Sequence, residues 1–429
     1  MSPTESFSMR LRLFHFFLLC VALIVANGQG NELPNFKLTP PIKPPAGSSS
    51  VIRDVCANYW ALVPVSKKQK QLLVLPTQAT AWISPNINGI APGNWQAVST
   101  DDDGFVWLKR AGRAVRFDPR KPAAGASEAT MPLPQPETRW QVVARMPASN
   151  HDLTAAVLGG KFYVAGGLTA DWGFPARSHP FDELWELNPA HWSWRVAAKF
   201  HRARIYCATA AFDNKVWVLG GDVIEPDGKR FAVTTTELCD PRTGNVIKGP
   251  ESTIARPMPI ALTTNDRLYV LGNPRDEYEK PGKMESIGLG EKNWRQEPDG
   301  PAGMGPLAGT SFADKLYVLV PKKGLAIFDT KTRQWELLMP PSIPRSCQMA
   351  AYRNEIWLLG GQDITDKTQT LIFNPNTRKW RNGPPLPRPN SWGAAATVNG
   401  KLIVTGGAAL RSENDRIYIY NDRTFVLQE

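Results

Sequence analysis

The sequence predicts an all-β protein built from repeated four-stranded antiparallel units. Two observations support this prediction: an apolar segment that ends in a pair of glycines, and a tryptophan that recurs late in most units. The glycine-pair segment occurs four times, at residues 161–167, 215–221, 355–361 and 401–407. This recurrence indicates one supersecondary unit copied several times along the chain. Such a repeat determines the fold class before any single residue is considered.

Residues 153–199 show the complete unit. A small-residue strand at 153–158 turns through two glycines into an apolar strand at 161–165, which ends in the glycine pair. A third strand follows at 183–187 and ends in an Asn-Pro turn, and Trp194 then opens the fourth strand. Short strands separated by Gly and Asx-Pro turns are typical of all-β proteins.

The recurring tryptophan has a physical reason. A single four-stranded antiparallel sheet cannot bury its own apolar face, so an indole is expected to wedge between neighbouring sheets. The wedge recurs as Trp140, Trp194, Trp294, Trp335 and Trp380, with Val246 and Phe425 as weaker substitutes.

Residues 51–139 keep the spacing of the repeated units, but their residue pattern differs from that of the later units. Two aromatic strands, at 58–62 and 104–108, repeat the turn-and-strand pattern without the glycine pair. We therefore expect a β-propeller of eight four-stranded blades, with seven or six as the alternatives. The last strand, 424–427, is expected to complete its own blade, unless residues near 51–56 close the ring.

These combined marks resemble the kelch-repeat β-propeller family. The resemblance covers residues 140–429 clearly and residues 51–139 loosely, so the whole of 51–429 is expected to be the propeller. It implies the fold and no particular activity, because kelch propellers include enzymes, glycan binders and scaffolds.

Residues 1–28 are expected to be a secretory signal peptide. Arg10 and Arg12 precede an apolar run, and small residues at positions 26 and 28 suit a cleavage site. The run is short for a membrane span, and an uncleaved anchor is the alternative. We expect a secreted or periplasmic protein with no stable membrane span after cleavage and a Pro- and Ser-rich linker at 29–50.

The formal net charge of +11 bears on possible partners. A basic exported protein suits anionic glycans or acidic proteins, although the Lys and Arg residues are scattered along the chain. Nucleic acid is not expected as a partner, because no clustered basic stripe is present.

The cysteines of the exported part are Cys56, Cys207, Cys239 and Cys347. Their spacing fits no zinc motif. An oxidising compartment permits disulfides between them in any of three complete pairings. The alternative is that most of them are buried small hydrophobic residues.

The candidate site is the mouth of the central channel, where loops from every blade converge. The resemblance to kelch proteins implies that a residue sixteen positions before each glycine pair faces that mouth. Counting back gives Asn150, Arg204, Arg256, Gly303 and Asn390, with Arg345 one residue from its expected place.

Three arginines on one ring would suit a carboxylate or sulfate, because guanidinium binds oxyanions through two parallel hydrogen bonds. The alternative is that they pair with an acid or a carbonyl of a neighbouring blade. His151 is either an acid or base at the mouth or a loop histidine bonded to nearby backbone. Trp392 either stacks on a sugar or packs inside the channel.

No catalytic signature accompanies the fold signature. Galactose-oxidase-like enzymes share the kelch propeller, but their copper site needs two His and two Tyr from separated elements. The histidines of the exported part all lie within 151–201. We therefore disfavour a copper radical oxidase, and no cofactor or metal site is predicted, because no phosphate loop, serine elbow or metal motif occurs.

The leading hypothesis is a non-catalytic module that binds a protein or glycan ligand at the channel mouth. The alternative is an enzyme acting on an acidic sugar, similar to sialic acid mutarotases, epimerases or polysaccharide lyases. A third hypothesis is a structural module within a larger surface complex, which predicts a large apolar patch on one face.

Overall fold

The computed structural model describes most of the chain from residue 42 onward. The described ranges are 42–54, 58–76, 79–100, 105–119, 122–129, 139–171, 177–225, 228–264, 266–303, 305, 308–362, 367–410 and 418–428. The predicted signal peptide, most of the predicted linker, and Cys56 lie outside these ranges. Every structural statement below concerns the described residues.

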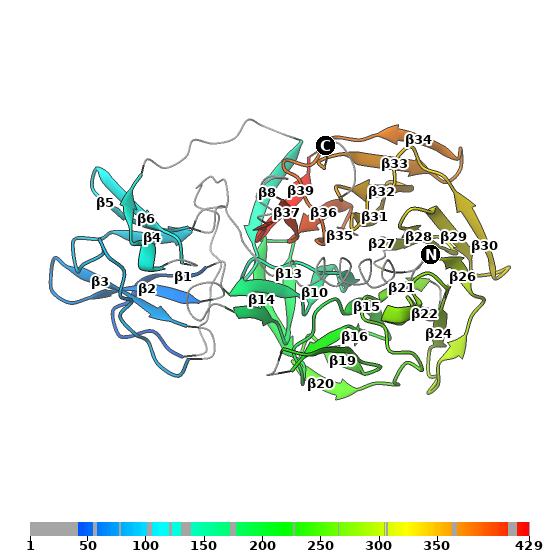
Figure 1. The fold of residues 1–429 in the computed structure, drawn as a ribbon, viewed down its shortest axis with the longest axis horizontal. Coiled ribbons are helices and arrows are strands. Elements are labelled where there is room, and N and C mark those ends of the chain that lie inside the picture. Colours follow the sequence, from blue (N-terminus) through cyan, green and yellow to red (C-terminus); the bar gives the residue numbers. More distant parts are fainter. Residues whose placement is uncertain are drawn as a thin grey trace, which may run out of the picture.

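Six four-stranded antiparallel sheets form a ring between residues 140 and 428 (Figure 1). Blade 1 contains β9 (Ala155–Leu158), β10 (Lys161–Ala165), β13 (Glu183–Asn188) and β14 (Ser193–Lys199). Blade 2 contains β15 (Ala208–Phe212), β16 (Lys215–Leu219), β19 (Thr236–Asp240) and β20 (Asn245–Lys248). Blade 3 contains β21 (Ile260–Thr264), β22 (Arg267–Leu271), β24 (Met284–Gly288) and β25 (Arg295–Gln296).

The remaining blades follow in chain order. Blade 4 contains β27 (Ala308–Phe312), β28 (Lys315–Val320), β29 (Gly324–Asp329) and β30 (Gln334–Leu338). Blade 5 contains β31 (Gln348–Tyr352), β32 (Glu355–Leu359), β33 (Thr370–Asn374) and β34 (Lys379–Asn382). Blade 6 contains β35 (Ala394–Val398), β36 (Lys401–Thr405), β39 (Arg423–Leu427) and β8 (Trp140–Arg145).

The ring is closed by a strand from its own beginning. β8 pairs antiparallel with β39, so that Trp140 lies opposite Leu427 and Arg145 lies opposite Arg423. The innermost strands of neighbouring blades contact one another around the circle, and β35 of blade 6 contacts β9 of blade 1. The prediction that 424–427 completes its own blade is therefore wrong: β39 is a third strand, and β8 is the fourth.

Two further sheets lie beside the ring and not within it (Figure 1). One contains β1 (Ser49–Arg53), β2 (Tyr59–Pro64) and β3 (Lys70–Leu75); the other contains β4 (Ala97–Thr100), β5 (Val106–Arg110), β6 (Arg113–Phe117) and β7 (Ser127–Glu128). A short 3-10 turn, η2 (Pro122–Ala124), precedes β7.

These two sheets pack on each other through an apolar cluster that includes Trp60, Trp95 and Phe117. The favoured count of eight blades in one ring is therefore wrong, because β8 closes the circle after six. The pair touches the ring through Arg53, whose guanidinium lies 3.7 Å from the Glu183 carboxylate of blade 1.

Apolar clusters fill the spaces between blades, one for each neighbouring pair. Phe162 of blade 1 and Ile403 of blade 6 share one such cluster, for example, and Tyr317 of blade 4 and Leu358 of blade 5 share another. Fully burying a large apolar side chain contributes about 1.5–3 kcal/mol. The stability of the ring therefore comes mainly from contacts between blades.

The prediction that tryptophans wedge between blades is confirmed. Trp140, however, belongs to blade 6, the last blade of the ring. Trp194 of blade 1 donates from Nε1 to Thr424 Oγ1 of blade 6, and Trp294 of blade 3 donates to the Pro250 carbonyl oxygen. Trp140 serves blade 6 through β8 and reaches toward the end of blade 5. Phe425, expected as a weak wedge, lies instead in the third strand.

The three described cysteines, Cys207, Cys239 and Cys347, are free thiols buried in the apolar clusters. Burial raises the pKa of the Cys207 thiol to about 11 and that of Cys347 to about 12, so both are protonated at neutral pH. Among the described residues, no helix has the length and apolar character to cross a membrane.

Candidate functional site

The innermost strands of the six blades surround a central channel of about 330 Å³. Its lining is uncharged and rich in small residues such as Ala155, Ala210, Gly309 and Ala395, with larger side chains such as Met349 among them. Repeated small residues let six strands approach one axis. With no charged group along its described wall, the channel leaves specific recognition to its mouth.

Four of the predicted site residues hold the ring together. We call Asn150, Arg204, Arg256 and Asn390 the anchor residues. Each is at least 97% buried, and each side chain donates to the carbonyl oxygen of the residue sixteen positions later. The bonds are Asn150 Nδ2 to Gly166 (2.8 Å), Arg204 Nη1 to Gly220 (3.4 Å), Arg256 Nε to Gly272 (2.9 Å) and Asn390 Nδ2 to Gly406 (3.0 Å).

The second glycine of the pair is required by the same contact. Gly167 has a φ of 88°, which non-glycine residues adopt at a cost, and a Cβ there would overlap Asn150 Oδ1. Gly407 has the same relation to Asn390. The sixteen-residue spacing therefore reflects a bond between an anchor residue and the glycine pair.

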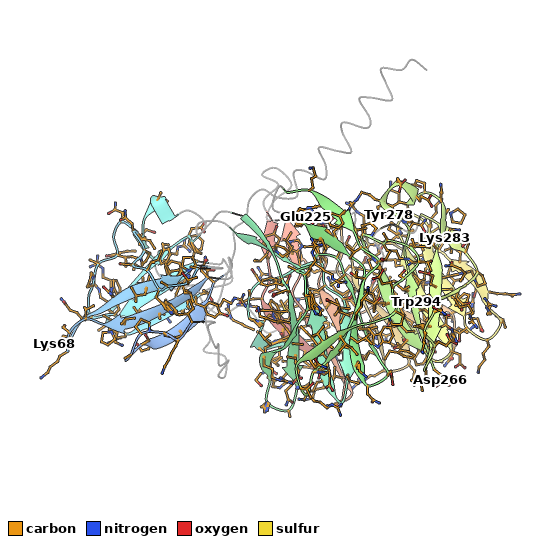
Figure 2. All side chains as sticks on the ribbon, turned by 90° about the horizontal axis from the view of Figure 1, so that it is seen from below. Lys68, Glu225, Asp266, Tyr278, Lys283 and Trp294 are labelled. Carbon is orange, nitrogen blue, oxygen red and sulfur yellow. The ribbon has the colours of Figure 1, made fainter. Side chains whose placement is uncertain are left out.

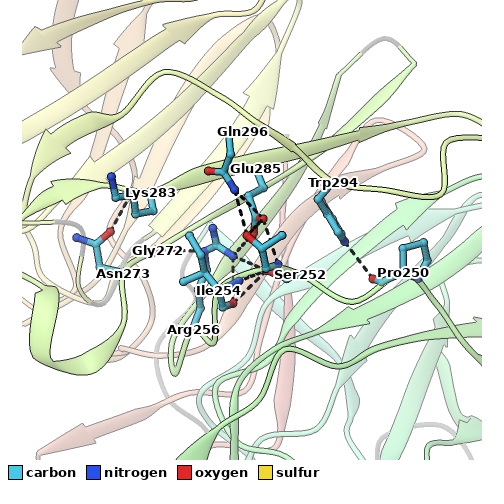
Figure 3. Close-up of polar contacts among 11 residues, drawn as sticks. Pro250, Ser252, Ile254, Arg256, Gly272, Asn273, Lys283, Glu285, Trp294 and Gln296 are labelled. Carbon is cyan, nitrogen blue, oxygen red and sulfur yellow. Dashed lines mark hydrogen bonds and ion pairs between the residues drawn. The ribbon is translucent and has the colours of Figure 1, made fainter.

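Arg256 is occupied by a buried ion pair (Figure 3). Its Nη1 lies 2.6 Å from Glu285 Oε2 and 2.6 Å from Ser252 Oγ, and both charged side chains are at most 1% exposed. Burial alone would raise the pKa of Glu285, but Arg256 and the Ser252 and Thr253 hydroxyls outweigh burial and lower it. The guanidinium is not available to a ligand.

Arg204 is occupied in a similar way. Its Nη2 lies 3.0 Å from Glu237 Oε2, its Nη1 donates to the Thr235 carbonyl oxygen, and the side chain is 3% exposed. Arg345 differs, because its backbone pairs with Gln362 and its Nη2 donates to Gln362 Oε1 at 3.3 Å. The predicted convergence of three arginines on one anion is therefore wrong.

A second set of residues lies two positions after the anchor positions. Asp152, Tyr206, Ser346 and Trp392, which we call the mouth residues, all have left-handed backbone conformations, with φ of 64°, 57°, 58° and 56°. Leu153, Cys347 and Gly393, the next residues in the chain, line the channel. A positive φ is costly for a bulky side chain such as Trp392, and such strain clusters at functional sites.

Backbone hydrogen bonds join the mouth residues of blades 5, 6 and 1. The Trp392 amide donates to the Ser346 carbonyl oxygen at 2.9 Å, and the Leu153 amide donates to the Trp392 carbonyl oxygen at 3.1 Å. These bonds cross blade boundaries at the channel rim. They hold the strained residues in one fixed arrangement.

His151 is positioned by three neighbours. Its Nδ1 lies 2.9 Å from Asp152 Oδ2, its ring stacks on Tyr420 with centroids 4.5 Å apart, and Trp392 lies 6.2 Å away. No hydrogen bond to Nε2 is formed within the described residues, although the residue is 7% exposed. The described neighbours of the His151 ring are side chains and not backbone, and its role as an acid or base stays a prediction.

Asp222, the first residue of β17 (Asp222–Ile224), extends the set of polar residues at the mouth from blade 1 to blades 2 and 3. It is 1% exposed, pairs through Oδ2 with Arg275 of blade 3, and has no described hydrogen bond to Oδ1. Burial raises the pKa of Asp222, Asp152 raises it further, and Arg275 and Arg230 lower it without reversing the shift. Burial also raises the pKa of the nearby Tyr278 phenol to about 12.

Four two-stranded sheets accompany the ring: β11 (Leu168–Asp171) with β12 (Arg177–Pro180), β17 (Asp222–Ile224) with β18 (Arg230–Ala232), β23 (Pro281–Gly282) with β26 (Gly300–Ala302), and β37 (Ala408–Leu410) with β38 (Tyr418–Tyr420). Leu168, Asp222 and Ala408 each bridge to the residue immediately before a mouth residue. The corresponding sheets of blades 1, 2 and 6 therefore start at the mouth.

The mouth is walled on one side. In blade 3 the connection contains the turn η3 (Arg275–Glu277), whereas blade 4 joins β28 to β29 through residues 321–323 alone. Figure 2 shows Glu225 and Tyr278 on one face of the ring and Asp266 on the opposite face. Within the described residues, two-stranded sheets thus accompany blades 6, 1, 2 and 3, and blade 4 has none.

Sequence reasoning found His151 and Trp392 but missed Asp152, Tyr206 and Asp222 as members of the site. Asp222 follows its glycine pair directly, and Asp152 and Tyr206 follow anchor residues by two positions. The same spacing rule, extended by two residues, would have found them. Arg275 and Tyr278 lie in a connection that no repeat predicts. Among the described residues, no group of three His, Cys, Asp or Glu side chains is arranged to hold a metal ion.

Comparison with known proteins agrees with this architecture. No protein-family model matches the chain. It is similar to Kelch-like protein 36 of Rattus norvegicus, 23% identical over 305 residues, which cover 67% of this chain and 40% of that protein. It is also similar to Kelch-like protein 25 of Xenopus tropicalis, 20% identical over 250 residues, which cover 56% of this chain and 41% of that protein.

A third relative is beta-scruin of Limulus polyphemus, 26% identical over 168 residues, which cover 34% of this chain and 18% of that protein. The chain therefore matches about two fifths or less of these relatives' lengths. Among solved structures, the "Structure of YjhT" superposes with a TM-score of 0.54 at 14% identity, over 66% of this chain and 96% of that one. At that identity the likeness shows the fold alone. Residues 140–428 form a β-propeller, and the chain is similar in sequence to kelch-repeat proteins.

Proposed function

We propose that this chain is a non-catalytic binding module that recognises a protein partner at the walled mouth of its propeller. The observation that carries the proposal is the ring of mouth residues. Four blades place a non-glycine residue in a strained left-handed conformation at the same position, and two of these residues are aromatic. Such strain persists only where the surrounding structure enforces it, and it is common at binding sites.

The one-sided wall supports a large ligand. Two-stranded sheets accompany blades 6, 1, 2 and 3 beside the mouth, and the short turn of blade 4 leaves the mouth low at that blade. Phe231 on β18 is 41% exposed, with the Arg202 guanidinium 5.6 Å from the centre of its ring. Exposed aromatic and arginine side chains are enriched in protein interfaces.

The enzyme alternative loses its main support. A site for an acidic sugar required arginines at the mouth to bind the carboxylate. Arg204 and Arg256 are instead committed to Glu237 and Glu285 inside the ring. A neutral glycan remains a possible ligand class, and the experiment below distinguishes it from a protein.

We also propose that the chain is exported, as residues 1–28 suggest. The support is the basic and apolar order of those residues. Expression of the full chain followed by N-terminal sequencing of the protein outside the cytoplasm is expected to find a start near residue 29. Recovery of the intact N-terminus from the cytoplasm would contradict export.

The binding proposal is tested by selecting displayed random peptides on the immobilised full chain and screening the same chain on a glycan array. Selected peptides are expected to lose at least about tenfold in affinity with Trp392→Ala, because an interface aromatic typically contributes 2 kcal/mol or more. Leu289→Ala is the matched control, since Leu289 is 61% exposed and lies beside Asp266 on the opposite face.

Peptides that respond equally to both substitutions would place binding away from the mouth and overturn the proposal. Glycan binding without peptide binding, abolished by Trp392→Ala, would replace the protein partner with a glycan. Chemical conversion of any bound ligand would show that the module is an enzyme.

A further inference from the structure

We propose that the mouth recognises a basic side chain of its partner, an arginine or a lysine, and holds it against the carboxylates of Asp152 and Asp222. This inference rests on the proposed function, because it names the chemistry by which the mouth would recognise a protein. Neither carboxylate belongs to the anchor residues, and within the described residues Asp222 joins blade 2 to blade 3 through Oδ2 alone.

The first argument is unused hydrogen-bonding capacity. An ionised carboxylate has two oxygens that together accept about four hydrogen bonds. Asp222 Oδ1 and Asp152 Oδ2 are both buried and accept no hydrogen bond from the described residues, and Asp152 Oδ2 has only the ionic contact with His151. Buried acceptors without donors are rare, so these atoms require an explanation.

The second argument is charge. The two carboxylates are each about 1% exposed and interact electrostatically; Arg275 and Arg230 act on Asp222, and His151 contacts Asp152. Burial raises the pKa of Asp222 above its ordinary value despite these cations, so the charged carboxylate is incompletely compensated. An additional cation would therefore be stabilised at this position, whereas an anionic ligand would be repelled.

The third argument is the shape of the surroundings. Arg275 already places a guanidinium from the chain itself on Asp222, and that side chain remains 44% exposed. The surroundings of the Asp222 carboxylate are therefore compatible with a planar guanidinium. Trp392 and Tyr420 flank His151 beside Asp152, and aromatic faces attract cations within about 6 Å of the ring centre.

The experiment compares two isosteric probes, N-acetyl-arginine amide and N-acetyl-citrulline amide, by calorimetric titration of the full chain. Citrulline keeps the size of arginine and lacks its charge. The arginine probe is expected to bind at least about tenfold more tightly, because charged hydrogen bonds are roughly twice as strong as neutral ones.

The variants Asp152→Asn and Asp222→Asn are expected to remove that preference. Asn tolerates the left-handed backbone of residue 152, so Asp152→Asn keeps the fold. Asp266→Asn on the opposite face is the matched control and is expected to leave the preference unchanged. Thermal melting of each variant confirms that the protein tested is folded.

Equal binding of both probes, no binding of the arginine probe, or a preference that survives Asp222→Asn in folded protein would each overturn the inference. The proposed function fails separately. If selected peptides lose affinity with Trp392→Ala but need no basic residue, the proposed binding function stands. Only the inference about a basic side chain is then overturned.

Discussion

The anchor residues and the mouth residues lie two positions apart in the chain and have opposite roles. Asn150 is fully buried and donates to a glycine carbonyl of its own blade, whereas Trp392 is half-buried at the channel rim. The anchors use ordinary backbone conformations, and each side chain is committed to a carbonyl oxygen inside the ring. The mouth residues combine a left-handed backbone with side chains of four different kinds, and Asp152 Oδ2 accepts no hydrogen bond from the described residues. One layer contributes stability, and the other remains available for recognition.

This difference shows where a repeat protein keeps its variable chemistry. The anchors alternate only between Asn and Arg, because either side chain can donate to a carbonyl oxygen at the same distance along the chain. The mouth positions hold Asp, Tyr, Ser and Trp, which include an acid, a small hydroxyl and two aromatic side chains. A position that varies while its backbone stays constant is suited to binding.

The largest expected effect is loss of the buried charge at Arg256. Arg256→Met leaves the Glu285 carboxylate buried without its cation and is expected to lower the free energy of unfolding by about 3–5 kcal/mol. Denaturant titration followed by tryptophan fluorescence measures this change. The double variant Arg256→Met/Glu285→Gln is expected to recover most of the loss.

Arg242→Met is the control for Arg256→Met, because Arg242 makes an exposed pair with Asp240 on the surface. Exposed ion pairs contribute little, so the unfolding midpoint is expected to stay unchanged. An equal loss in both variants would show that the buried pair is not special.

A smaller effect is expected for the asparagine anchors. Asn150→Ala removes a buried donor from the Gly166 carbonyl oxygen and is expected to cost about 1–3 kcal/mol. Asn390→Ala is expected to cost less, because Asn421 Nδ2 also donates to the Gly406 carbonyl oxygen at 3.1 Å. Denaturant titration of both variants tests the order, and a larger cost at Asn390 would contradict it.

Glu285, the partner of the anchor Arg256, and Asp222, beside the mouth residue Tyr206, are expected to respond oppositely to acid. The pKa of Glu285 is lowered in the folded state, so its contribution is present above its unfolded pKa and is lost as pH falls through the folded value. The pKa of Asp222 is raised, so the folded state gains a proton more readily and this group favours folding as pH falls.

Melting temperatures of the wild type, Glu285→Gln and Asp222→Asn across the acid range measure these contributions. On acidification the wild type is expected to lose stability relative to Glu285→Gln and to gain it relative to Asp222→Asn. The same sign for both comparisons would contradict the separation of the two layers.

The smallest effect on stability is expected at the mouth. Asp152→Asn preserves shape and suits a φ of 64°, so the free energy of unfolding is expected to change by less than about 1 kcal/mol. The same variant is expected to lose binding of the arginine probe. A loss of stability comparable to that of Arg256→Met would make Asp152 a structural residue.

Much of the ring could be predicted from sequence because its marks are local. The glycine pairs and the tryptophan wedges each fix a turn or a packing contact within a short segment. Trp140 was recognised as a wedge, but its blade could not be assigned, because its strand pairs with β39, which lies almost 280 residues later in the chain. The two N-terminal sheets have the same spacing along the sequence as the repeats. Spacing alone does not show which sheets belong to the ring.

The site was only partly predictable for a related reason. Spacing located the right loop but not the direction of its side chains, so Arg204 and Arg256 were assigned to the mouth although they point to internal acids. Asp222, Arg275 and Tyr278 come together from blades 2 and 3. Contacts between blades depend on the closed ring, which no local pattern contains.

The most direct test measures stability and binding together in folded Arg256→Met and Asp222→Asn. Arg256→Met is expected to lower the free energy of unfolding and to leave the affinity for N-acetyl-arginine amide unchanged at a temperature where it is folded. Asp222→Asn is expected to reduce that affinity by about tenfold or more with a much smaller change in stability. If Arg256→Met weakened binding while folded and Asp222→Asn did not, the assignment of the two layers would be contradicted.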